Sequence, residues 1–208
     1  MSNQKIITID NLSLQEFDSE AELIPLLTPE DEEEMNNEEL PEDLPILPLR
    51  NTVLFPGVVI PITAGRDKSI KLINDANAGN KIIGVVSQMN EEDEDPTQND
   101  INRVGTVARI LRILKMPDGN ITVILQGKKR FEIDTITTEV PYIRATIKEV
   151  PEKRPKKGEK EFNAIIDSLK ELATQIIQES PNIPTEATFA IKNIESQSFL
   201  VNFVSSNM

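Results

Sequence analysis

Residues 44–66, LPILPLRNTVLFPGVVIPITAGR, constrain the fold more than any other part of the chain. This stretch is rich in aliphatic side chains, yet it carries prolines at positions 45, 48, 56 and 61. Because proline lacks a backbone N–H and fixes φ, a strand that contains it pairs only at a sheet edge or in short pieces. The aliphatic residues supply more apolar area than a loop needs. We therefore predict short, interrupted strands that pack into a core.

The residues that follow predict one helix and then several strands. A helix is expected over 67–78, because its apolar residues cluster on one side and Gly79 ends it. Strands are expected over 81–87, 104–116, 121–126, from Arg130 onward and over 142–150, with a turn at 117–120 that makes a hairpin. The pattern indicates an α+β fold, namely a small, closed or half-closed barrel of mostly antiparallel strands with one inserted helix.

The last quarter of the chain has a different composition. Residues 151–160 are polar and charged and contain two prolines, which predicts a linker. Residues 161–179 carry apolar side chains at helical spacing, and Pro181 and Pro184 end that helix. A second helix is expected from about Thr185 to residue 193, and a third from a Ser196 cap to about 205. We predict the start of a helical bundle over 161–208 and expect the natural chain to continue past Met208.

The charge is concentrated in the amino-terminal arm. Residues 1–43 hold 14 acidic residues and one basic residue, whereas the remaining residues hold 21 of each. Like charges repel and bury little area, so we predict a disordered arm over 1–43; the alternative is an acidic tail that binds a basic partner. The balanced charge of the rest argues against a dedicated nucleic-acid binder.

Missing residue types exclude several chemistries. The chain has no cysteine, which excludes disulfides and thiol nucleophiles and fits a reducing cytoplasm. It has no histidine, which excludes a Ser-His-Asp triad and imidazole metal ligands. No apolar run reaches the length of a membrane span, and the start lacks the features of a secretory signal. We therefore expect a soluble, cytoplasmic chain.

Three segments are candidates for sites of chemistry. Residues 127–129, GKK, lack the glycine and the Ser or Thr of a phosphate-binding loop, so we predict a tight turn with solvated lysines. The acidic run 91–95 lacks EF-hand spacing and favours a solvated loop over a cation site. Lys68 and Ser69 are neighbours on a predicted helix and point in different directions. We predict no catalytic, cofactor-binding or metal-binding residue and no cofactor.

Two surfaces remain as candidates for binding. The basic groups at 128–130 and 153–157 could contact RNA, but only Tyr142 and Phe131 lie near enough in sequence to stack on bases. The hairpin strands carry apolar side chains on both faces, of which only one can face the barrel; these residues are Leu111, Ile113, Leu114, Met116, Ile121, Val123, Ile124 and Leu125. Either the helical half covers the remainder or it is exposed as an interaction site. Our hypothesis is that the hairpin tip, with Leu114, Met116 and Ile121, contacts unfolded polypeptide.

The wording of several segments resembles a known family. These are LPLRNTVLFPGVVIPI, the GR and RDKSIKLINDANAG that follow, KIIGVVSQ, INRVGTVARILRILKMPDGNITVILQGKKRFEI and PYIRATIKEV. They resemble the amino-terminal domain of Lon-family ATP-dependent proteases over residues 44–150, and more loosely to Met208. The resemblance implies a PUA-like pseudo-barrel. The positions that carry the resemblance are expected to support the fold; they are Pro48, Leu49, Arg50, Phe55, Pro56, Gly65 and Arg66. Among them, Phe55 is expected in the core, and both arginines are expected to pair with carbonyls or acids.

The resemblance also implies a function. A Lon protease unfolds misfolded and regulatory proteins with an ATPase ring that uses ATP and Mg²⁺, and it cleaves them with a serine–lysine pair. The amino-terminal domain would capture unfolded or damaged substrates and help hold the hexamer together, without catalysis of its own. The alternative is a free-standing adaptor or ligand-binding module that is not attached to an ATPase. Membrane binding is not expected.

Overall fold

The structure is a computed structural model that describes residues 6–7, 24–25, 28–117, 119–152, 159–180 and 186–207. The chain divides into two compact units. The sheet unit comprises residues 33–152 and 205–208, and the helical unit comprises residues 1–32 and 153–204.

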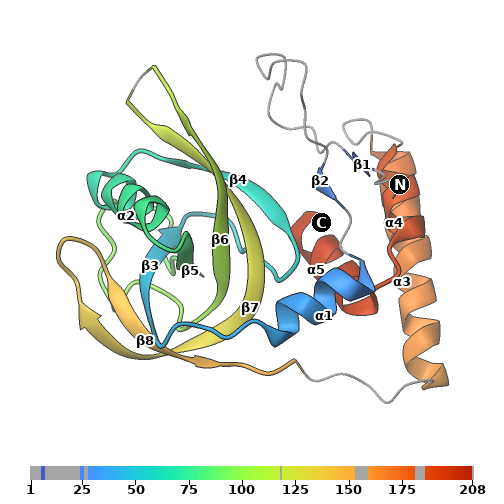
Figure 1. Cartoon of the computed structure of the whole chain (residues 1–208). Helices are drawn as coiled ribbons and strands as arrows, with labels where there is room; N and C mark the ends of the chain where they lie inside the picture. The colour runs from blue at the N-terminus through green and yellow to red at the C-terminus, as the bar shows by residue number, and fades with distance from the viewer. Residues whose placement is uncertain are drawn as a thin grey trace. The chain divides into compact units, whose positions relative to one another are not determined.

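The sheet unit is a barrel. Its strands are β3 (Asp43–Leu49), β4 (Val59–Ala64), β5 (Ile82–Ser87), β6 (Val104–Lys115), β7 (Ile121–Thr138) and β8 (Arg144–Glu149). They follow the order β4-β7-β6-β5-β3-β8, and β8 also pairs with β7, so five of the strands close into a ring (Figure 1). Only the β3–β5 pairing is parallel among these strands. The predicted barrel of mostly antiparallel strands is confirmed.

The prolines of residues 44–66 sit where a strand needs few hydrogen bonds. β3 pairs with β8 over residues 43–45 and with β5 over residues 46–49, so each half has one partner strand. β4 lies at the sheet edge and pairs only with β7. Both arrangements avoid the ladder position that proline cannot fill. The expected edge or short-piece pairing is confirmed.

Helix α2 (Asp67–Ala78) connects β4 to β5, as predicted. Its buried residues are Ser69, Leu72, Ile73 and Ala76, and the helix packs against β3 and β5. Inside the barrel, the main apolar cluster consists of Leu44, Ile46, Ile82, Val86, Ile101, Val107, Phe131, Ile133, Ile143 and Ala145. The large ring of Phe131 is fully buried in this cluster. Its position fixes the middle of β7 inside the barrel.

Residues 127–129 are not the predicted turn. They lie inside β7, which runs without a break from Ile121 to Thr138. Gly127 exchanges two backbone hydrogen bonds with the loop after β3: its carbonyl accepts from the Gly57 N–H, and its N–H donates to the Val58 carbonyl, both at 2.9 Å. A β-carbon at Gly127 would lie 2.2 Å from the Phe55 carbonyl oxygen. The glycine therefore marks a close backbone approach within a strand.

The lysines beside Gly127 are also not solvated, contrary to the prediction. Lys128 is half-buried and pairs with Glu38 at 3.1 Å, and Lys129 is buried and pairs with Glu149 at 3.3 Å. Both carboxylates come from distant parts of the chain. The prediction was wrong because nothing near residue 127 in the sequence indicates that Glu38 and Glu149 pair with these lysines.

Part of the arm for which we predicted disorder is ordered. Helix α1 spans Pro29–Asn37, and strands β1 (Ile6–Ile7) and β2 (Ile24–Pro25) pair with each other. Thr28 and Asp31 cap α1 reciprocally, since each side chain accepts the other residue's N–H at 3.1 Å. After the helix, Glu38 forms ion pairs with Arg109 and Lys128. The rest of residues 1–27 lies outside the described part of the chain.

Three helices form the carboxy-terminal part: α3 (Lys160–Glu179), α4 (Glu186–Asn193) and α5 (Gln197–Asn207). Their positions agree with the prediction, and α3 packs against α4. The Ser196 hydroxyl accepts the Phe199 N–H at 3.0 Å, which confirms the predicted cap of α5. The linker residues 153–158 and the two helix-breaking prolines lie outside the described residues.

Candidate polypeptide-binding surface

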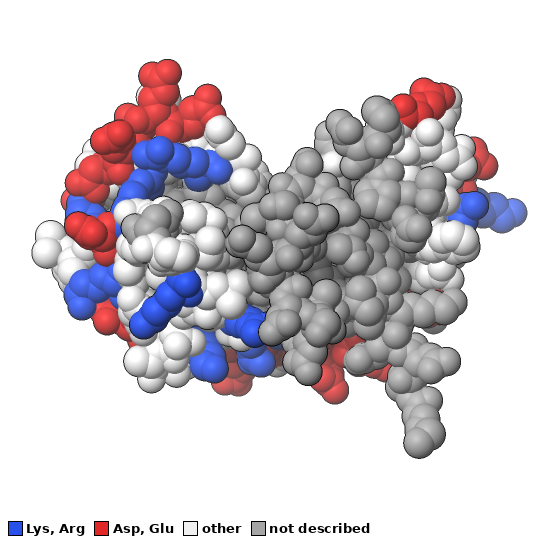
Figure 2. All heavy atoms as spheres, turned by 90° about the horizontal axis from the view of Figure 1, so that it is seen from above, with Lys and Arg blue, Asp and Glu red and all other residues white. Residues whose placement is uncertain are grey.

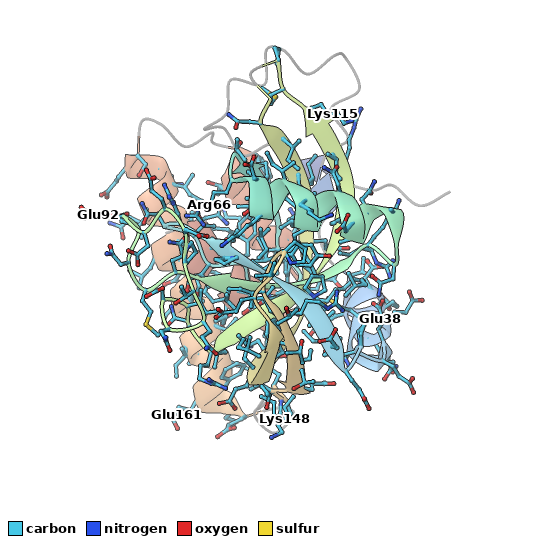
Figure 3. All side chains as sticks on the ribbon, turned by 90° about the vertical axis from the view of Figure 1, so that its left-hand side faces the viewer. Glu38, Arg66, Glu92, Lys115, Lys148 and Glu161 are labelled. Carbon is cyan, nitrogen blue, oxygen red and sulfur yellow. The ribbon has the colours of Figure 1, made fainter. Side chains whose placement is uncertain are left out.

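The predicted hairpin is present and consists of β6 and the first part of β7. At its end the Met116 N–H donates to the Asn120 carbonyl at 2.9 Å, and Gly119 adopts a φ of 89° that favours glycine. Lys115 marks the same end in Figure 3. Asp118 lies outside the described residues. The hairpin thus presents a short, closed turn at one end of the sheet unit.

Exposed apolar side chains lie along β6 near this turn. Met116 is 42% exposed and Leu111 is 47% exposed, whereas Leu114 is half-buried. Ile121, the third residue of the sequence hypothesis, is only 4% exposed. It shares the buried face of β7 with Val123 and Leu125, because alternate strand residues face the same side. We call Leu111, Met116 and the half-buried Leu114 the exposed apolar set; Ile121 does not belong to it.

Leu111 is exposed and lies at a β-bulge of β6. Ile110 pairs with Leu125 and Arg112 pairs with Ile124, so Leu111 is the extra residue on β6. Its exposure follows the regular alternation of the strand, because Arg109 is exposed and Ile110 is buried. The sequence placed Leu111 among the apolar residues of the hairpin, but no local signal marks the bulge.

The two signature arginines meet at one point of the structure. Arg50 Nη2 and Arg66 Nη2 both donate to the Asp93 carbonyl oxygen, each at 3.1 Å. Arg66 Nη2 also donates to Gln88 Oε1 at 2.6 Å. The expectation that both arginines pair with carbonyls or acids is confirmed. Burial and the neighbouring charge of Arg50 lower the pKa of Arg66, and the carboxylates of Asp95 and Glu94 oppose this effect.

The other signature positions do not form a shared exposed site. Leu49 is buried, Pro48 and Pro56 are half-buried, and Gly65 is exposed next to the Asn120 side chain. Phe55 is half-buried, whereas the adjacent Leu54 is the residue that lies in the core. Phe55 was predicted to be core, and the structure supports this only in part.

The basic residues considered for RNA are engaged with carboxylates. Lys128 and Lys129 are paired as described above, and Arg130 pairs with Glu152 at 3.6 Å. On the face seen in Figure 2, both acidic and basic side chains are present. A nucleic-acid site instead concentrates positive charge on one face. These ion pairs argue against a nucleic-acid site at residues 128–130; residues 153–157 lie outside the described chain.

Helix α3 carries a second exposed apolar surface, in the helical unit. Ile165 is 58% exposed, Leu172 is 59% exposed and Ile176 is also exposed. The buried face of the same helix consists of Ile166, Ala173 and Ile177. The helix therefore has apolar side chains on two faces, of which one is covered within the described residues.

No arrangement of side chains for catalysis or metal binding is found in the part of the chain that the structure describes. There, no three acidic side chains gather as a metal site. The Lys68 amine binds the Asp95 carboxylate at 2.6 Å, and the adjacent Ser69 is buried. No helix among the described residues combines the length and the apolar character that a membrane crossing needs.

Known proteins are similar to this chain in sequence and in fold. A family model described as the ATP-dependent protease La (LON) substrate-binding domain matches residues 43–208. The whole chain is 82% identical to part of a Lon protease from Flavobacterium johnsoniae, of which it covers 26%. Over 90% of its length it is 50% identical to a Lon protease from Cytophaga hutchinsonii, of which it covers 23%. The chain thus spans about a quarter of the length of these relatives.

The solved N-terminal domain of Mycobacterium avium complex Lon protease is similar in structure, with a TM-score of 0.64 and 20% sequence identity. The match covers 79% of this chain and 82% of that domain. At this identity the likeness concerns the fold alone.

Proposed function

The chain belongs to the family of Lon substrate-binding domains, and from this premise we propose that it captures unfolded or damaged polypeptides for an ATP-dependent serine protease. The family and the relatives' names support this proposal. The parent protein spans about four times the length of the chain, as its relatives do. Its ATPase part binds ATP and Mg²⁺, and its peptidase part cleaves the captured chain with a serine–lysine pair. The chain itself binds and does not cut.

The observation that carries the proposal is the exposed apolar set at the hairpin end. Unfolded polypeptides differ from folded ones in the apolar side chains that they expose, and an exposed apolar patch binds them without needing a defined sequence. A methionine in such a patch suits varied partners because its side chain is flexible. Met116 stands at the tip, beyond the last pair of the β6–β7 ladder.

The parent protein acts as a hexamer in the cytoplasm, and this chain contributes to its assembly. The absence of cysteine supports a reducing compartment. Six copies in a ring present six hairpin ends, so a long unfolded chain can contact several of them. Several weak contacts raise the overall affinity well above that of one contact.

The experiment replaces Met116 and Leu114 with Asp and measures the affinity for a permanently unfolded protein. We expect the affinity to fall by roughly thirtyfold, because two apolar side chains that each contribute about 1 kcal/mol are replaced by charges. The matched control is Val140→Asp, since Val140 is 79% exposed and lies elsewhere in the sheet unit.

Unchanged affinity in a folded M116D/L114D variant would refute the proposed surface. A loss of equal size in the Val140→Asp control would show a general charge effect. Binding of RNA that falls steeply with salt would favour the nucleic-acid alternative, because phosphate contacts release counterions.

A further inference from the structure

The arginine pair, Arg50 and Arg66, has an unusual acceptor. Both guanidinium groups point to the Asp93 carbonyl oxygen, and Gln88 Nε2 donates to the same atom at 3.0 Å. Three donors thus converge on one neutral oxygen, which has two lone pairs. Arg66 lies beside the loop that carries Glu92 in Figure 3. Two positive charges thus converge on a neutral oxygen, and the carboxylates of Glu94 and Asp95 act on Arg66 only electrostatically.

Both arginines carry more N–H donors than the hydrogen bonds described above use. Among the described residues, neither Arg50 nor Arg66 lies within 4.0 Å of a carboxylate oxygen, although eight other ion pairs form. A guanidinium carries five N–H donors in a planar fork. Both protein hydrogen bonds of Arg66, and the one of Arg50, use the Nη2 atom. The remaining donors match the two oxygens of a carboxylate better than a single carbonyl.

We propose that Arg50, Arg66 and Gln88 form a subsite for a carboxylate of the bound polypeptide, which the Asp93 carbonyl fills in the free chain. This inference rests on the proposed function and extends it from apolar capture to a polar anchor. The carboxylate comes from an Asp or Glu side chain or from a chain terminus. A carboxylate displaces the carbonyl because a charge-assisted hydrogen bond is stronger than a neutral one.

The loop over residues 91–95 competes with an incoming carboxylate for the arginines. Residues 91–95 carry Glu91, Glu92, Asp93, Glu94 and Asp95, and the Lys68–Asp95 ion pair at 2.6 Å provides a separate anchor for the loop. When a carboxylate enters, the loop gives up the Asp93 contacts and keeps this anchor. Glu94 interacts with Arg66 electrostatically, so its charge opposes an incoming carboxylate. Glu94→Gln should therefore tighten the binding of an acidic peptide.

The test uses three versions of one unstructured apolar peptide. One has a central Glu and an amidated terminus, one has a central Gln and a free terminal carboxylate, and one has neither carboxylate. Fluorescence anisotropy measures their affinities for the 208-residue chain. We expect at least one carboxylate peptide to bind about fivefold more tightly than the neutral peptide, as is typical of a partly exposed ion pair. The difference should shrink as salt is added.

Variants distinguish a binding role of the arginines from a role in holding the loop. Arg50→Gln and Arg66→Gln should abolish the preference for a carboxylate and leave the affinity for the neutral peptide unchanged. Lys68→Gln loosens the same loop without removing a guanidinium, and it should keep the preference. Arg50 is exposed, so Arg50→Gln keeps the fold and decides the question even if Arg66→Gln does not fold.

Equal affinity of wild type for all three peptides would overturn the inference and leave the proposed function standing. So would a preference that survives Arg50→Gln, or one that Lys68→Gln removes as completely as the arginine variants. If none of the peptides binds, both the inference and the proposed function fall.

Discussion

A single methyl group at Gly127 should destabilise the barrel more than its size suggests. In Gly127→Ala the added carbon would lie 2.2 Å from the Phe55 carbonyl oxygen and 3.2 Å from a methyl carbon of Thr106, whereas ordinary contact begins at 3.4 Å. The nearest atoms belong to the backbone, which cannot rotate away. The two chain segments must therefore separate by about 1.2 Å.

This separation strains the two hydrogen bonds that Gly127 exchanges with Gly57 and Val58, each 2.9 Å long. Each such bond contributes about 0.5–1.5 kcal/mol, and forcing extra volume into a packed site costs about 1–3 kcal/mol. The smaller entropy of the unfolded chain with alanine returns about 0.4–1 kcal/mol. The expected loss is roughly 2–4 kcal/mol, or about 6–12 °C in the melting temperature for 3 kcal/mol.

The assay is thermal and urea unfolding of Gly127→Ala beside a matched control, Gly65→Ala. At Gly65 the close neighbour is the end of the Asn120 side chain, at 2.7 Å, and that end can rotate away. The control should change the stability by less than about 1 kcal/mol. If both variants unfold together with the wild type, the close approach of β7 to the loop after β3 does not exist.

Three further changes test separate contacts. Burial raises the pKa of Glu38, but Lys128 and Arg109 outweigh it, so the folded pKa lies below the ordinary 4.5. Its contribution to stability is thus present above pH 4.5 and lost as the pH falls through the folded pKa. Glu38→Gln should therefore reduce the melting temperature slightly at pH 7, and by less as the pH is lowered below 4.5. Thr106→Val removes the 2.6 Å hydrogen bond to the buried Leu54 carbonyl and should cost about 1–3 kcal/mol in urea unfolding, whereas Thr106→Ser should keep most of it. Ser196→Ala removes the cap of α5 and should cost about 1 kcal/mol, which Ser196→Asp should restore if the cap is the cause.

The sequence predicted some features of the candidate surfaces and not others. The place of Met116 at the hairpin end followed from the turn signal at 117–120, whereas the sequence left open whether its side chain is covered or exposed. The burial of Ile121 and the bulge at Leu111 did not follow, because both depend on the register of β6 against β7. The meeting of Arg50 and Arg66 on Asp93 requires three separate segments of the chain. A family signature named both arginines but not their shared acceptor.

Local patterns in the sequence determined the elements that depend on their own residues. α2 and α3 follow from helical spacing and from residues that end a helix, and the hairpin follows from its turn. Only the tertiary structure decided that β7 continues through Gly127, that Lys129 is buried and that α1 is ordered. These features rest on backbone approaches and ion pairs between residues far apart in the chain. The periodicity of apolar residues depends only on neighbours along the chain. Contacts between residues far apart in the chain form only when the barrel closes.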